Sequence, residues 1–507
     1  MNTLSLIRHG LAFMTAFAMA STAVGQTTLR IGLAEDPDEL DPTKARTYVG
    51  RIVFSSLCDK LFDIDDKLNI VGQLATSHET AADGRSMTIR LRPGVKFHDG
   101  EPFTAEAAKF SIERHLTLQG SFRRAEIAQI DRVEVVDSLT VRLQLKTPFA
   151  PLLAQLTDRA GMMVSPKAAQ ALGDKFGTAP VCAGPYRFVE RVAQDRIVVE
   201  RFADYWDKGR VHIDRIIYRP IQDSTVRLAN LKSGQLDLLE RLLATDAPQV
   251  SKDPKLKLVT GTELGYQGIT MNLANGEKAN SPLAKDARVR RAFELSLDRD
   301  AINQVVFNGI NKVNNQWVSQ TNPYYQAKFP TPKRDVARAR ALLKEAGVST
   351  PLALDFMVPN NPETRAVAEV MQSMAAEAGF DLKIRVTEFA TSLNEAEKGN
   401  FQLYMLAWSG RTDPDGNIFS FASCKGPLNY GRYCNAEMDG LLDKARTITS
   451  VPERKALYEQ VAQRWLNEGS VVYLYHRALL FGHTPRLEGF KVMPDGLIRV
   501  TDLKLGR

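Results

Sequence analysis

The sequence lacks the short motifs that many enzyme classes require. Its 507 residues contain no G-x-S-x-G elbow, no H-E-x-x-H zinc helix, no P-loop and no G-x-G-x-x-G turn. The seven histidines are scattered, and His98 stands next to Asp99 in an Asp-Gly turn. We therefore expect a binding protein without a cofactor rather than an enzyme. An exported hydrolase and a secreted chaperone or adhesion scaffold are the alternatives.

Long hydrophobic runs are missing except near the N-terminus. After Arg8, residues 11–20 are apolar, and Ala23-Val24-Gly25 follows them. This order is typical of a cleavable export signal, and the apolar run is shorter than the roughly 20 residues that span a bilayer. The alternative is a membrane anchor, but no cysteine for a lipid anchor lies near the cleavage position. We predict a signal peptide at residues 1–25 and a soluble, periplasmic mature protein.

Positive charge is not concentrated in any one segment. The net charge is +7, but Lys and Arg alternate with acids, as in Lys333-Arg334-Asp335. The absence of a basic arm argues against a nucleic-acid partner. Composition is ordinary for a globular protein, with 44% hydrophobic and 25% charged residues and no low-complexity tract. A chain of this length exceeds one usual core, so two or three domains are expected.

Cysteine is scarce, and its even count in an exported chain favours disulfides over thiol chemistry. Four cysteines leave three connectivities open. Cys424 and Cys434 are close in sequence, with a polar stretch between them that can turn back. We therefore expect this pair, and by elimination Cys58 with Cys182. A cysteine metal site is not expected, because no C-x-x-C spacing occurs.

Residues 86–104, SMTIRLRPGVKFHDGEPFT, carry the clearest local pattern. Met87, Ile89 and Leu91 alternate with polar residues and predict a half-buried strand. Pro93-Gly94 predicts a turn, residues 95–97 a resumed strand, and Asp99-Gly100 a second turn. Thr104 predicts the start of a helix. None of these residues suggests chemistry.

Helix signals are strongest in the C-terminal half. Asn361 predicts an N-cap, Pro362 a first helical residue and Gly379 an end. Ser450 and Glu453 have the spacing of a capping box. Gly347 predicts the end of a helix over 338–346. Alternating strand and helix signals along the chain predict a mixed α/β fold.

Five segments in order resemble family 5 extracellular solute-binding proteins, the peptide and nickel receptors of ABC importers. Residues 86–104 resemble the signature of that family. The other segments are Ala183-Gly184-Pro185-Tyr186, residues 201–239, the set Met271-Asn272, 286–292 and Asp298-Arg299, and ARALLKEAG at 339–347. The resemblance covers nearly the whole chain after the signal.

The resemblance implies an α/β, two-lobed periplasmic binding protein of type II, cluster C-like, with an extra domain and three domains in all. Domain I of lobe one would comprise 26–45, 180–264 and 480–507, the extra domain II 46–179, and domain III of lobe two 265–479. Such a protein traps its ligand between lobes by hinge closure and docks on a membrane permease. We expect a monomer.

The best pocket candidate is residues 408–421, WSGRTDPDGNIFSF. Trp408 offers a flat apolar wall, and Arg411 a planar fork for a carboxylate. Dipeptide receptors of this family resemble W-x-x-D here, with the acid on the peptide ammonium; this chain has Arg411 instead. A ligand with an anionic group near Arg411 is one hypothesis, and pairing of Arg411 with Asp413 or Asp415 is the other.

Further predicted ligand-binding residues are Asp413, Tyr48, Tyr266, Gln267 and Trp317. The ligand itself does not follow from the sequence. Peptides, modified peptides, sugar-like solutes and opine-like acids fit the class. A nickel chelate fits the resemblance, but no histidine cluster at ligand spacing supports it, so we predict no metal site.

Overall fold

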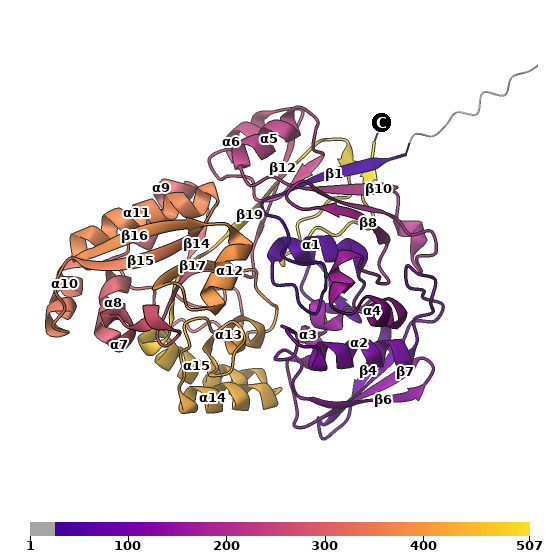
Figure 1. Cartoon of the computed structure of the whole chain (residues 1–507), viewed down its shortest axis with the longest axis horizontal. Helices are drawn as coiled ribbons and strands as arrows, with labels where there is room; N and C mark the ends of the chain where they lie inside the picture. The colour runs from indigo at the N-terminus through magenta and orange to yellow at the C-terminus, as the bar shows by residue number, and fades with distance from the viewer. Residues whose placement is uncertain (1–25, 507) are drawn as a thin grey trace, which may run out of the picture.

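The chain folds into two lobes of mixed α/β structure (Figure 1). The computed structural model describes residues 26–506, so the predicted signal peptide lies outside the described residues. The first lobe contains a seven-stranded and a four-stranded sheet, and the second is built on a six-stranded sheet. The predicted α/β class is confirmed.

The seven-stranded sheet collects strands from three distant parts of the chain. β1, which begins at Thr28, lies in its centre and runs parallel to both of its neighbours, β10 and β11. Leu29, Ile31 and Leu33 of β1 are fully buried, which gives this sheet its core. In spatial order the strands are β12 (Lys257–Thr262), β19 (Ala478–His483), β11 (Leu238–Leu239), β1 (Thr28–Leu33), β10 (Arg215–Pro220), β9 (Arg196–Arg201) and β8 (Tyr186–Val192).

The four-stranded sheet contains the segment that the sequence pattern marked. Met87, Ile89 and Leu91 of β5 are buried, and Thr104 accepts a hydrogen bond from the Ala107 N–H at the start of α2 (Ala105–Thr117). The resumed strand at 95–97 was wrong, because Lys96 forms only an isolated bridge there. The antiparallel order is β4 (Ala75–Thr80), β5 (Ser86–Leu91), β7 (Thr140–Leu145) and β6 (Ile130–Asp137), and β2 (Phe62–Ile64) pairs separately with β3 (Ile70–Gly72).

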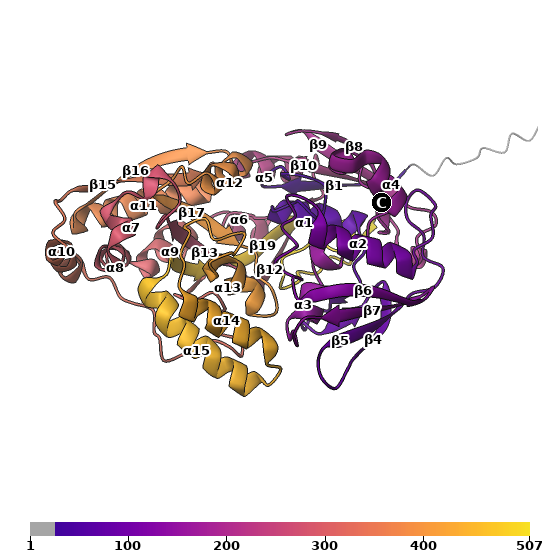
Figure 2. The ribbon, with the colours of Figure 1, turned by 60° about the horizontal axis from the view of Figure 1, so that its bottom comes forward.

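The six-stranded sheet forms the second lobe, with helices on it and a three-helix group below it. Figure 2 shows α14 (Ala436–Thr447) and α15 (Val451–Glu468) side by side in that group, next to α13 (Asp415–Ala422). In order the strands are β14 (Lys312–Val313), β18 (Val471–His476), β13 (Tyr266–Met271), β17 (Leu403–Trp408), β15 (Leu352–Pro359) and β16 (Phe380–Thr387).

The helices begin and end largely where capping residues predict. Asn361 caps α11 through the Thr364 N–H, and Gly379 ends it with a left-handed φ of 97°. α10 ends before Gly347 but begins at Val336, earlier than predicted. The capping box at Ser450 was wrong, because its side chain makes no cap bond.

The other helices follow the chain through both lobes. They are α1 (Tyr48–Leu57), α3 (Leu152–Gln155), α4 (Pro166–Leu172), α5 (Ser224–Lys232), α6 (Ala247–Lys252), α7 (Pro282–Lys285), α8 (Ala287–Leu295), α9 (Arg299–Phe307), α10 (Val336–Glu345), α11 (Pro362–Ala378), α12 (Phe389–Glu397), α13 (Asp415–Ala422), α14 (Ala436–Thr447) and α15 (Val451–Glu468). Short 3₁₀ turns lie at Arg159–Gly161, Gly173–Thr178, Lys208–Arg210 and Glu277–Ala279, and β20 (Leu487–Glu488) pairs with β21 (Lys504–Leu505).

Two very short connections join the seven-stranded and six-stranded sheets. β12 passes into β13 through residues 263–265, and β18 passes into β19 through Arg477 alone. The two connections lie together, since the Glu263 N–H donates to the Arg477 carbonyl over 3.1 Å. These crossings are where one lobe can rotate against the other.

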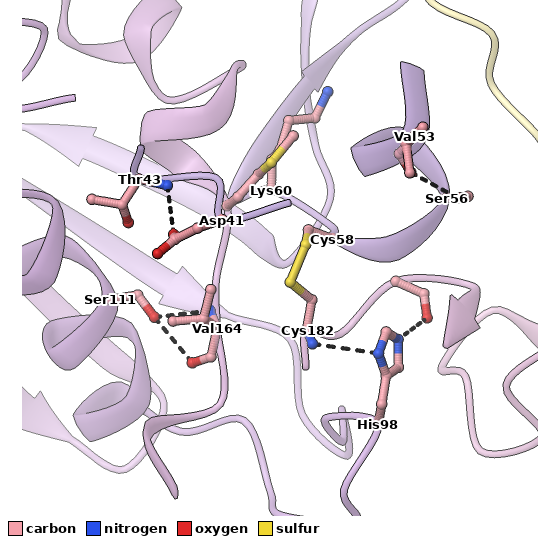
Figure 3. The surroundings of a disulfide bond; sticks show 12 residues. Asp41, Thr43, Val53, Ser56, Cys58, Lys60, His98, Ser111, Val164 and Cys182 are labelled. Carbon is pink, nitrogen blue, oxygen red and sulfur yellow. Dashed lines mark hydrogen bonds between the residues drawn. A yellow bond between two sulfur atoms is a disulfide. The ribbon is translucent and has the colours of Figure 1, made fainter. Parts of the chain in front are cut away.

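Both expected disulfides are confirmed: Cys58 with Cys182 and Cys424 with Cys434. The first fastens the end of α1 to the segment that leads into β8. Figure 3 shows the ring of His98 next to this bond, where its Nδ1 accepts from the Cys182 N–H over 3.3 Å. The other ring nitrogen bonds the Gly184 carbonyl at 3.0 Å. His98 therefore braces the chain where it returns to the seven-stranded sheet.

Candidate ligand-binding cavity

A cavity lies between the two lobes, beside the crossing strands. Its empty space is about 770 Å³, including the part that opens to solvent. Both lobes supply its walls, so closure of the lobes determines its shape. The lining residues are Glu35, Arg46, Tyr48, Arg241, Gln267, Pro359, Asn361, Thr364, Phe389, Leu393, Met405, Leu406, Ala407, Trp408, Ser409, Phe421, Leu428, Tyr430 and Arg477.

The wall of the second lobe is apolar and aromatic. Trp408, at the end of β17, packs edge-on against Phe421 of α13 with ring centroids 4.9 Å apart. Its indole N–H donates to the Asn417 side chain over 3.0 Å, which fixes the ring plane. A fixed aromatic face of this kind can stack on a flat ligand group at little entropic cost.

The wall near the crossing strands is charged. Arg241, which follows β11, pairs with Glu35 at 2.7 Å. Arg477 pairs with Glu263 at 3.1 Å, so an ion pair joins the two crossings. Burial alone would lower the pKa of Arg477, but Glu263 raises it, so the guanidinium stays charged. The cavity therefore presents both charge signs next to its aromatic wall.

Arg46 also lines the cavity, and it contacts both lobes. Its guanidinium pairs with Glu397 of α12 at 2.9 Å and with Asp38 of the first lobe at 3.5 Å. It also donates to the Asn394 side chain at 2.7 Å. These bonds connect the two lobes. The Glu397 side chain is 43% exposed, so its pair contributes little to stability.

Arg411 does not line this cavity. Its guanidinium pairs with Asp158 of the first lobe at 2.6 Å and lies over the Trp408 ring at 4.4 Å from the centroid. Arg51 of α1 donates to the same Asp158 at 3.1 Å and to Ser409 at 3.0 Å. The expected alternative of an Asp413 or Asp415 partner was wrong: these acids pair with Arg454 and Arg446.

The other predicted ligand residues separate into two groups. Tyr48, Gln267 and Trp408 line the cavity. Tyr266 is buried against Tyr473 at 4.7 Å, and Trp317 is 1% exposed in the apolar core near Tyr458. Asp413 holds Arg454 through two bonds of 2.6 Å. A ligand contact for Arg411, Asp413, Tyr266 or Trp317 stays a prediction, and the cavity walls do not include these four.

Several cavity residues did not stand out in the sequence. Glu35, Arg241 and Arg477 each lie just beyond a strand, where a charged residue usually faces solvent. One indication of a role for Arg477 was present in the sequence, because this residue lies next to the predicted domain boundary at residues 479 and 480. Among residues 26–506, no group of three or more His, Cys, Asp or Glu side chains is placed to hold a metal ion.

Comparison with known proteins gives this geometry its context. Residues 69–429 match the family model described as bacterial extracellular solute-binding proteins, family 5 Middle. The chain belongs to this family. It is a solute-binding protein of an ABC importer, with a small-molecule or peptide ligand and a membrane permease as partners. No helix within residues 26–506 has the length and apolar character needed to cross a bilayer.

A sequence relative and two solved structures each match nearly the whole chain. The glutathione-binding protein GsiB of Pectobacterium atrosepticum is 30% identical over 506 residues, covering 97% of each chain. The periplasmic binding protein AgaA of A. tumefaciens R10, solved with agropinic acid, is 27% identical with a TM-score of 0.86, covering 95% of this chain and 99% of AgaA. A dipeptide-binding protein of Pseudoalteromonas sp. SM9913, solved with Met-Leu, has a TM-score of 0.88 at 23% identity, covering 94% of this chain and 100% of its own.

Proposed function

We propose that this family 5 protein acts in the periplasm and binds glutathione or a similarly short, anionic peptide for import. The observation that carries the proposal is the cavity itself, where an aromatic wall at Trp408 faces the charged side chains of Arg241 and Arg477. The near full-length similarity to glutathione-binding proteins supports it, although those names describe the relatives.

The chemistry of glutathione suits these walls. The tripeptide carries two carboxylates and one ammonium group, which need partners of both signs. Guanidinium groups bind carboxylates in a planar, two-point geometry. Its peptide planes and small thiol side chain present surface that can pack on an indole ring.

An opine-like acid is the second candidate. The similarity to AgaA, solved with agropinic acid, favours it at 27% identity. Such an acid carries carboxylates but fewer peptide groups. It would therefore depend more on the guanidinium groups of Arg241 and Arg477 than on packing against the aromatic wall. The nickel-complex proteins among the structural neighbours share the fold at 20% and 22% identity.

The remaining parts of the proposal concern the whole chain. We propose cleavage after residue 25, a monomeric receptor, and no catalytic turnover. The strand membership of the sheets supports a domain I of 26–45, 180–264 and 480–507, a domain II of 46–179, and a domain III of 265–479. β19 begins at Ala478, two residues before the proposed boundary.

Calorimetry of the mature protein with a ligand panel tests the function. The panel contains glutathione, its disulfide, Met-Leu, agropinic acid and Ni²⁺ with histidine. Glutathione should bind with a Kd of about 1 μM or tighter and raise the melting temperature of the protein. Mass spectrometry of the mixture after incubation should detect glutathione and no product formed from it. Binding of another panel member with no glutathione binding would overturn the proposed ligand. Appearance of a product would overturn the receptor role.

A further inference from the structure

Two smaller spaces adjoin the charged end of the cavity. They measure about 460 and 440 Å³, including the parts that open to solvent, and all three spaces are lined by Arg241 and Arg477. Both smaller spaces are lined by Glu363. Their linings include residues 478–481 of β19 and residues 361–364 at the start of α11, and Arg46 lines neither space.

Carboxylates outnumber their counter-charges at this end. Arg241 serves both Glu35, at 2.7 Å, and Glu240, at 3.4 Å. Arg477 is taken up by Glu263. Within residues 26–506, no Lys, Arg or His nitrogen lies within 4.0 Å of the Glu363 carboxylate. One acid of the cavity wall is thus left without an ion-pair partner.

Two buried carboxylate oxygens also lack hydrogen bonds inside the described chain. Glu240 is fully buried, its Oε1 accepts from the Ala34 N–H, and its Oε2 has no hydrogen-bond partner among residues 26–506. Glu35 is 7% exposed, and its Oε2 atom also has no hydrogen-bond partner among residues 26–506. Buried acceptors of this kind are costly unless a donor reaches them.

The positive groups nearby decide what kind of cation fits. Arg227, Arg241 and Arg477 all act on Glu363, whose pKa is nevertheless raised because burial outweighs them. A bare divalent ion would be repelled by these guanidiniums. A primary ammonium that carries its own carboxylate would not, because each guanidinium has five donors and its ion pairs use only some of them.

We propose that this end of the cavity is a subsite for an α-amino-acid head group, with the ammonium held by Glu240 and Glu363 and the α-carboxylate by Arg241 and Arg477. The inference rests on the proposed function, and it specifies how the ligand is oriented. In glutathione the γ-glutamyl end carries this head group, so the glycine end would point toward Arg46.

The test pairs ligands that differ only in the ammonium. Glutathione and N-acetylglutathione form one pair, and γ-glutamyl-leucine and N-acetyl-γ-glutamyl-leucine the second, each titrated by calorimetry into wild type. Glu363→Gln removes the charge and keeps the shape. Glu369→Gln is the matched control, because Glu369 is exposed on the same helix and is absent from the cavity lining. Melting temperatures check that both variants fold.

Wild type and Glu369→Gln should prefer the free amine over its acetylated partner by about tenfold or more. In Glu363→Gln the preference should shrink to less than about threefold. Equal binding of both members of each pair by wild type, or an unchanged preference in Glu363→Gln, overturns the subsite while leaving the receptor role intact. If glutathione does not bind but the γ-glutamyl-leucine pair is discriminated, only the proposed ligand is overturned. If none of the free-amine ligands binds to wild type, the subsite is contradicted as well.

Discussion

Asp158 and Arg411 form a buried ion pair that joins the two lobes at 2.6 Å, with side chains 4% and 7% exposed. Burial alone would raise the pKa of Asp158, but Arg411 and Arg51 hold it well below its usual range. Burial, with Arg51 nearby, lowers the pKa of Arg411 to about 10. Both side chains are therefore charged at neutral pH in the buried pair, and the pair exists only while the two lobes are together.

Asp158→Asn should weaken ligand binding although it changes no cavity wall. It leaves Arg411 and Arg51 buried without their shared acid, which penalises the closed arrangement by about 3 kcal/mol or more. We expect at least a tenfold or so loss of affinity by calorimetry, with a more open particle in X-ray scattering. The double variant Asp158→Asn, Arg411→Met should recover part of the loss. Unchanged affinity in both variants would refute this role.

Arg411→Ala separates a ligand contact from a contact between lobes. If Arg411 acts only through Asp158, every ligand loses affinity by a similar factor of about ten. If it binds the ligand carboxylate, esterification of that carboxylate should abolish the effect of the substitution. Unchanged affinity would exclude both roles.

Trp408 should report ligand binding by its fluorescence, whereas Trp317 should not. Trp408 lines the cavity, and Trp317 is 1% exposed within the core. Trp408→Phe should remove the ligand-induced change in fluorescence. It should also lower affinity by about tenfold or more, because the phenyl ring offers the ligand less aromatic surface than the indole ring. Trp317→Phe is the control and should retain the change. The reverse result would place the ligand elsewhere.

The two disulfides should differ in their effect on stability. Cys58–Cys182 closes a sequence separation of 124 residues, and Cys424–Cys434 one of 10. In the chain-entropy model these separations correspond to about 5 and about 3 kcal/mol. Cys58→Ser with Cys182→Ser should therefore lower the denaturant midpoint more than Cys424→Ser with Cys434→Ser. Equal midpoints would contradict the model for this chain.

His115 should make stability fall as the solution is acidified. Its Nδ1 pairs with the Thr43 hydroxyl at 2.9 Å and its Nε2 with the Met162 carbonyl at 3.2 Å, while burial lowers its pKa to about 4. Arg114 also opposes its charging, and Asp41 favours it. Between pH 6.5 and 4 the unfolded state takes up the proton first, so the native state loses up to about 3 kcal/mol.

Comparison with His115→Gln isolates that contribution. Asp59, whose pKa burial raises to about 7, changes stability in the opposite direction, but it is common to both proteins. The stability advantage of wild type, measured by urea unfolding, should therefore shrink from pH 7 to pH 4. A constant advantage across this range would show that His115 titrates normally.

Local chemistry was sufficient to predict much of the fold. The alternation at Met87, Ile89 and Leu91 and the caps at Thr104 and Asn361 depend on neighbours in sequence, and they hold in the structure. Ser450 has the same local pattern, yet its side chain makes no cap bond. Its helix also has a proline in the first turn and Gly469 at its end, so these local signals do not decide whether the serine side chain caps the helix.

The site was harder to predict because burial of charge is a tertiary property. Arg411 had acids two and four residues away, yet it pairs with Asp158 from the other lobe. Asp413 forms an ion pair with Arg454, and Asp415 forms one with Arg446; both arginines lie on helices further along the chain. Glu35 and Arg477 resemble solvated loop residues until the strands beside them are brought together.

Within residues 26–506, the chain passes between the two main sheets only through residues 263–265 and through Arg477. Chain this short allows the lobes to turn but not to drift apart. Most of the translational freedom that separate walls would lose on meeting a ligand has already been given up during folding. When a dilute solute binds to one lobe, the other lobe is therefore already close by, at a high effective concentration, and can close on the solute.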